Sequence, residues 1–268
     1  MPLVGKDIIT SLKKLKRELA AHGDAKRAEG ASAYLKHVLK HHGVATPELR
    51  ECLCGFYSEH DDMTREELLK AALFLWDSDY WEEKIAAVAL LNRYEKLLAP
   101  TDLDFLGDLC AQSGTWALLD TLATVGLPAL VMRHPALYTK VRKWSKSDAM
   151  WKRRASILVH LRPMIGRDRK SRLPKGITAD ERNVRPDLFY STAAELAHEK
   201  EFFIRKAIGW VLREVSKLRP EEVRDFLLAH PGEFSGLTMR EACKYLPEKM
   251  LRELGLEVKP KKLATKKR

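Results

Sequence analysis

The chain has 268 residues, and its 48 Lys and Arg against 37 Asp and Glu give a formal net charge of +11. Apolar residues make up 45% and charged residues 32%, which is enough to bury a core and excludes disordered or collagen-like chains. Four cysteines without metal-ligand spacing predict neither a disulfide framework nor a structural zinc, and they fit a reducing compartment.

Helical signals begin at the N-terminus, and strand signals are nearly absent. Thr64 and Glu67 have the spacing of a capping box. Thr46-Pro47 and Arg219-Pro220 have the pattern of an N-cap followed by proline. A stripe at helical spacing comes first in the chain and consists of Ile8, Ile9, Leu12, Leu15 and Leu19. These signals predict an all-α protein.

The segment from Gly114 to Met132 has 19 residues with a single ionisable group, Asp120. This is nearly the length that spans a bilayer, but a carboxylate at mid-span costs roughly 2.5–3.5 kcal/mol. The segment therefore predicts two buried helical pieces that meet near Gly126-Leu127-Pro128, and no membrane association.

Aromatic residues recur with a period typical of stacked helix pairs. Trp81, Trp116 and Trp151 are each separated by 35 residues, and Phe203 follows in a similar segment. The predicted fold is an all-α, HEAT-like helical-repeat solenoid of stacked antiparallel helix pairs with a concave basic face. One domain is expected over residues 1–258, with an insertion loop at about 163–186.

Positive charge is concentrated in two places. Residues 259–268 contain six basic residues and no acid, which predicts a disordered tail. Between Lys140 and Arg172 twelve basic residues face only two acids, for a net charge of +10. A basic region on a folded domain indicates a polyanionic partner, most often nucleic acid.

Trp116 and Asp120 are four residues apart in TWALLDTL, so on a helix they share a face. Taken alone, this spacing is typical of a core Trp and a helix-end Asp. The position of Asp120 within an apolar stretch favours a functional role instead, because a desolvated carboxylate needs a partner. Arg154 and Arg213 are the cations expected to supply it.

Over roughly residues 24–246 the sequence resembles the AlkD-type DNA alkylation repair glycosylases, a HEAT-like helical family. The most specific stretch is EFFIRKAIGWVLRE (201–214), supported by GVATPELR (43–50), SGTWALLDTLA (113–123) and MWKRRASILVHL (150–161). Two departures are the insertion at about 163–186 and Thr115, where another aromatic is expected before Trp116.

The resemblance implies roles for individual residues. It places the catalytic aspartate on Asp120 and the tryptophans that line the lesion on Trp116 and Trp210. The implied DNA-binding residues, with neighbours in the basic region, are Arg154, Arg213, Tyr34, Lys152 and Arg153. No metal or other cofactor is expected.

The implied activity is that of a monofunctional DNA glycosylase in base excision repair. It would hydrolyse the N-glycosidic bond of cationic alkylated purines, such as N3-alkyladenine and N7-alkylguanine, in double-stranded DNA without a base-flipping pocket. The expected protein is a monomer in a bacterial-type cytoplasm, associated with the nucleoid through DNA. Two alternatives stay open: a non-catalytic HEAT-like DNA-binding protein, and a scaffold for protein–protein contacts.

Overall fold

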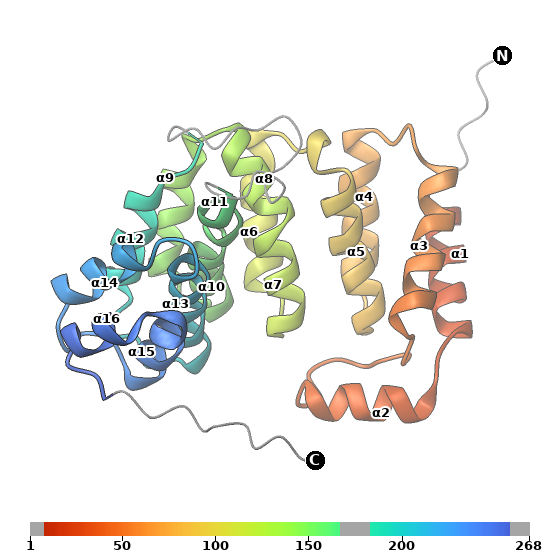
Figure 1. The fold of residues 1–268 in the computed structure, drawn as a ribbon. Coiled ribbons are helices and arrows are strands. Elements are labelled where there is room, and N and C mark those ends of the chain that lie inside the picture. The colour runs from red at the N-terminus through yellow and green to blue at the C-terminus, as the bar shows by residue number, and fades with distance from the viewer. Residues whose placement is uncertain (1–7, 167–182, 258–268) are drawn as a thin grey trace. The chain divides into compact units, whose positions relative to one another are not determined.

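A computed structural model describes residues 8–166 and 183–257. The protein is all-α: the described residues contain no β-strand, and Lys40 and Tyr80 form an isolated parallel bridge. The chain divides after Lys140 into two compact units. In each unit helices pack side by side as stacked antiparallel pairs, which confirms the predicted fold class (Figure 1).

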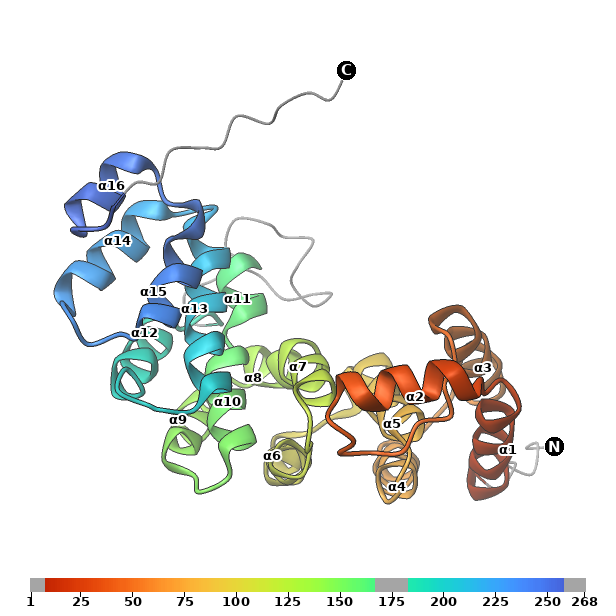
Figure 2. The ribbon, with the colours of Figure 1, turned by 90° about the horizontal axis from the view of Figure 1, so that it is seen from below.

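The first unit contains the helices as far as the start of α9. Its stack is visible in both views, where α4 lies beside α5 and α1 beside α3 (Figure 2). Its α-helices are α1 (Ile8–Ala21), α2 (Ala25–Tyr34), α3 (Thr46–Glu59), α4 (Arg65–Trp76), α5 (Trp81–Arg93), α6 (Leu103–Ala111), α7 (Trp116–Thr124), α8 (Gly126–Arg133) and α9 (Leu137–Arg142), with 3-10 turns η1 (Glu95–Leu97) and η2 (Pro100–Asp102).

The second unit begins at Val141, within α9. Within it α13 packs against α10, α14 and α15. Its elements are η3 (Lys143–Lys146), α10 (Met150–Leu158), α11 (Leu161–Gly166), α12 (Pro186–Glu195), α13 (Phe202–Ser216), α14 (Pro220–Ala229), α15 (Gly236–Ala242), η5 (Cys243–Tyr245) and α16 (Glu248–Glu253).

Local signals fix several helix ends. The Thr64 hydroxyl accepts a bond from the Glu67 backbone N–H, and the Glu67 carboxylate accepts one from the Thr64 N–H at 2.9 Å, which confirms the capping box of α4. Arg219 is the N-cap of α14 ahead of Pro220. At α3 the expected cap is wrong by one residue, because Ala45 is the N-cap and Thr46 is already helical.

The apolar segment after Gly114 forms two helices, as predicted. Helix α7 ends at Thr124 and α8 begins at Gly126, where the backbone N–H donates to Asn92 Oδ1 at 2.8 Å. The stretch Trp116–Arg133 is apolar and long enough to cross a membrane, but 61% of it is buried inside the protein. A core helix of a globular protein has the same composition.

The aromatic period places one ring near the start of one helix in each repeat. Trp81 and Trp116 are the first residues of α5 and α7, while Trp151 and Phe203 are the second residues of α10 and α13. The 35-residue spacing is therefore the distance in sequence between equivalent helices of successive repeats.

The predicted insertion starts within a helix, since residues 163–166 complete α11 and Arg219 Nη2 donates to the Met164 carbonyl at 2.9 Å. Residues 167–182 and the basic tail lie outside the described residues. A single domain over 1–258 stays a prediction, because a solenoid whose repeats contact only their neighbours also divides into compact parts.

Candidate functional site

Helix α7 carries the predicted carboxylate and tryptophan on its less buried face. Leu118, Leu119 and Leu122 are fully buried, whereas Trp116 and Asp120 are half-buried. Thr115, the departure from the family pattern, is itself buried and caps the helix, with its hydroxyl accepting from the Leu118 N–H at 3.5 Å. A hydroxyl thus starts the helix where an aromatic was expected.

Tyr34, the last residue of α2, lies beside Trp116. The two ring centroids are 5.9 Å apart with an interplanar angle of 81°, an edge-to-face contact. The Tyr34 side chain is otherwise exposed, at 69%. The structure therefore brings three of the predicted residues, Tyr34, Trp116 and Asp120, to one part of the first unit.

Polar contacts rather than apolar burial hold the N-terminal end of α2, which contributes no buried residue of its own. The Asp24 N–H donates to the His42 carbonyl at 3.0 Å, and Arg27 Nη1 donates to the Gly43 carbonyl at 2.8 Å. The loop that supplies these carbonyls is itself held by Glu82, whose buried carboxylate accepts the backbone N–H groups of His42, Gly43 and Val44 at 2.9, 2.8 and 3.2 Å.

Strain marks the turn that follows Tyr34. Lys36 and His37 both have positive φ values, 62° and 57°, which L-residues rarely adopt. The turn is closed by the His37 N–H, which donates to the Ser32 carbonyl at 2.7 Å, and by a side-chain contact between the same residues at 3.1 Å. Strained backbone persists only where surrounding contacts hold it.

In the second unit, Arg154 is buried on α10. Its guanidinium donates to the Phe203 carbonyl and lies 5.9 Å from the Phe203 ring centroid. Trp151 packs on the same ring with centroids 5.0 Å apart. Arg154 therefore ties α10 to the first turn of α13.

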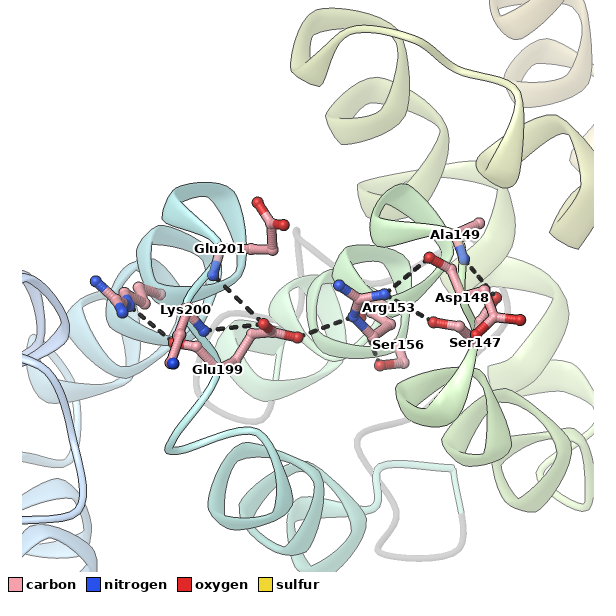
Figure 3. A network of polar contacts seen from close by, with 9 residues as sticks. Ser147, Asp148, Ala149, Arg153, Ser156, Glu199, Lys200 and Glu201 are labelled. Carbon is pink, nitrogen blue, oxygen red and sulfur yellow. Dashed lines mark hydrogen bonds and ion pairs between the residues drawn. The ribbon is translucent and has the colours of Figure 1, made fainter.

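Arg153 is held by a network of polar contacts (Figure 3). Its Nη1 donates to the carbonyls of Ser147 and Asp148 at 2.8 and 3.0 Å, and its Nε pairs with Glu199 Oε2 at 3.0 Å. The neighbouring Lys152 places its Nζ over the Trp144 ring, 5.5 Å from the centroid. The protein's own acceptors and rings thus engage both predicted DNA-binding side chains.

Helix α13 carries Trp210 and Arg213, both half-buried. Arg213 pairs with Glu241 of α15 and, at 3.3 Å, with Glu214. Lys206, one turn before Trp210, pairs with the same Glu241 at 2.7 Å. Glu241 therefore binds a cation on either side of Trp210.

The family model described as DNA alkylation repair enzyme matches residues 15–246. The chain belongs to this family. No curated protein matches it.

Solved structures support the fold of this DNA alkylation repair family member. A predicted DNA alkylation repair enzyme from Enterococcus faecalis has a TM-score of 0.70 and 21% identity, covering 85% of this chain and 98% of its own. AlkD2 from Streptococcus mutans has a TM-score of 0.60 and 17% identity, with coverage of 90% and 99%. At these identities the likeness shows the fold alone.

The predicted site residues of this family member are divided between the two units. Tyr34, Trp116 and Asp120 belong to the first unit, and the second contains Trp210 with the four cations Lys152, Arg153, Arg154 and Arg213. Among the described residues, no group of three or more His, Cys, Asp or Glu side chains could hold a metal ion.

Sequence reasoning missed the carboxylates Glu82, Glu199 and Glu241. A signal for one of them exists in the repeat length, because Glu241 lies 35 residues after its partner Lys206. Residues about one repeat apart occupy neighbouring helices, so charges at this separation are candidates for pairing.

Proposed function

We propose that this member of the DNA alkylation repair family is a monofunctional DNA glycosylase that hydrolyses the N-glycosidic bond of cationic alkylated purines in duplex DNA. The observation that carries the proposal is the set of Asp120, Trp116 and Tyr34, a half-buried carboxylate one helical turn from an indole that packs against an exposed phenol. The same surface suits a cation, because a carboxylate and aromatic faces all attract positive charge.

The proposed chemistry needs no metal. A purine alkylated at N3 or N7 is already cationic, so when the C1′–N bond breaks, the electron pair neutralises the leaving base. Positive charge moves to the sugar, water adds to C1′, and the water proton is released. Asp120 stabilises this charge and orients the water.

The size of the effect can be set by Coulomb's law. A carboxylate about 4 Å from a unit positive charge contributes roughly 4 kcal/mol at an effective dielectric constant near 20. That energy corresponds to about three powers of ten in rate. Each Trp face near the cation adds roughly 0.5–2 kcal/mol.

Partners and location follow from the same proposal. The enzyme acts as a monomer on double-stranded DNA in the cytoplasm, and it grips the backbone without drawing the base into a pocket. Exposed cations at Arg142, Lys143 and Lys146 support contact with phosphate.

The proposal is tested by the release of free base from methylated duplex DNA. We expect Asp120→Asn to lower the single-turnover rate by roughly 10²–10³-fold, because the developing charge loses its counter-charge. DNA affinity should stay the same or rise, since one negative charge is removed. Asp104→Asn, which neutralises an exposed carboxylate on α6, is the matched control.

Equal rates for wild type and Asp120→Asn would remove Asp120 from the mechanism. Tight binding without any base release by the wild type would instead establish the non-catalytic DNA-binding protein.

A further inference from the structure

Two cations flank Trp210 on one face of α13. Lys206 lies four residues before Trp210 and Arg213 lies three residues after it, so the three side chains share a helix face. A cationic purine on Trp210 would approach both positive charges. The two cations would therefore repel the cationic base unless negative charge nearby offsets them.

Glu241 of α15 meets both cations with separate oxygens. Lys206 Nζ lies 2.7 Å from Glu241 Oε1, and Arg213 Nη1 donates to Oε2. The hydrogen bond from Lys206, aided by the charges of Lys206 and Arg213, holds the pKa of Glu241 below its ordinary value against the effect of burial. The carboxylate therefore stays ionised.

Backbone geometry sets the place of Glu241. A Cβ at Gly209, next to Trp210, would lie 2.6 Å from Glu241 Cβ and 3.1 Å from the Thr238 carbonyl oxygen. Only glycine allows α15 to pack this closely on α13. The Thr238 hydroxyl donates to the Arg205 carbonyl at 3.3 Å and holds the first turn of α15 on α13.

We propose that Glu241 is a positioning residue for the reaction: it holds Lys206 and Arg213 at the flanks of Trp210 and, with Glu214 on Arg213, offsets their charge there, so that the indole can accept a cationic base. The inference rests on the proposed function and on the contact between Trp210 and the lesion that the family resemblance implies. It adds a role for a carboxylate that does not touch the substrate.

Glu241→Gln is the direct test, with two readouts that respond differently: the excision rate and the affinity for undamaged duplex. We expect excision of methylated purines to slow by roughly tenfold or more, because the negative charge that faces both cations is lost and their repulsion of a cationic base grows. Affinity for undamaged duplex should not fall. For binding to undamaged duplex, the slope of log K against log salt should steepen by about 0.9 for each released cation that contacts a phosphate.

A charge rescue separates this role from a structural one. Adding Lys206→Gln to Glu241→Gln removes the cation that has lost its carboxylate partner, so excision should recover at least in part. Lys206→Gln alone changes a side chain that is 41% exposed and leaves Arg213 paired with Glu241. It should fold normally and should not slow excision. Glu253→Gln on α16, which pairs with Arg224 at 3.3 Å, is the matched control for losing a carboxylate.

Each result has a consequence. Wild-type excision by Glu241→Gln, a loss that Lys206→Gln does not relieve, or slower excision by Lys206→Gln alone would each overturn the inference. A wild type that releases no base would end the proposed function, but the salt slope on undamaged duplex would still test whether Glu241 restrains the two cations. An unchanged slope would then overturn the restraint.

Discussion

Arg154 has two candidate roles that differ in what they contact. Its guanidinium is buried and donates to the Phe203 carbonyl, which joins α10 to α13. The family resemblance assigns it to the DNA groove, where it would meet phosphate. The contact with Phe203 acts on stability and the contact with phosphate acts on salt-dependent binding, so the two can be measured separately.

We expect Arg154→Ala to lower the free energy of unfolding by about 2 kcal/mol, because the partly buried Phe203 carbonyl loses a charged donor. Urea denaturation measures this loss, with Lys152→Ala as the neighbouring control. A phosphate contact would also flatten the slope of log K against log salt by about 0.9. An unchanged slope with reduced stability would restrict Arg154 to joining the two helices.

His160 makes stability depend on pH. The side chain is fully buried, 5.9 Å from the Phe189 ring centroid, and burial lowers its pKa from 6.5 to about 3. The unfolded chain therefore takes up a proton near pH 6.5, whereas the folded chain does not until about pH 3. The contribution of neutral His160 to stability is complete above pH 6.5 and is lost as the pH falls towards 3.

Between pH 7 and pH 5 the wild type should lose about 2 kcal/mol more unfolding free energy than His160→Gln, which cannot titrate. Chemical denaturation at the two pH values gives the difference directly. Parallel losses in both proteins would show that His160 is protonated with an ordinary pKa in the folded state.

At the scale of single elements, α2 depends on a tight contact at Gly43. This residue has a φ of +80°, and a Cβ there would lie 2.2 Å from the Asp24 carbonyl oxygen and 2.6 Å from the Ala28 nitrogen. A methyl group would therefore separate α2 from the loop that Glu82 holds.

Gly43→Ala should accelerate hydrogen exchange of the α2 amides by roughly tenfold, the change that about 1.4 kcal/mol produces. Gly232→Ala is a matched control, since Gly232 has a φ of +74° with nothing within 4 Å of the added Cβ. In Gly232→Ala the added methyl group strains the backbone but collides with no neighbouring atom. Equal exchange of α2 in both variants would show that the contact at Gly43 does not hold the helix.

Much of the element structure was predictable because its causes are local. The capping box at Thr64, the break before Gly126 and the aromatic at the start of each repeat all depend on residues within one turn or on a fixed period. The carboxylate contacts were not predictable, because Glu82 binds the distant loop at Gly43 and Glu241 binds cations on another helix. Their contacts depend on how the helices stack, which no single segment of the sequence specifies. For the site, the sequence indicated Tyr34 and Trp116, but not that Tyr34 would pack edge-on against the indole at 5.9 Å.

At the scale of the whole molecule, charge governs the encounter with DNA. Removing residues 259–268 lowers the formal net charge from +11 to +5. We expect the truncated chain to bind duplex more weakly at low salt, with little difference at high salt, because released counterions supply this part of the affinity. Filter binding over a salt series measures the effect, and the excision rate at saturating enzyme should not change.

Unaltered binding at low salt would show that the tail does not reach the duplex, and a slower rate at saturation would give it a part in the reaction itself.

The absence of buried residues in α2 has a consequence for how this sequence can diverge. A helix that supplies nothing to the core places few packing demands on its ten positions, and substitutions at such positions usually change stability by less than about 0.5 kcal/mol. Most residues of α2 can therefore be substituted during evolution while the other helices keep their packing. For protein engineering, α2 is a segment where libraries can be built next to Trp116 at little cost in folding.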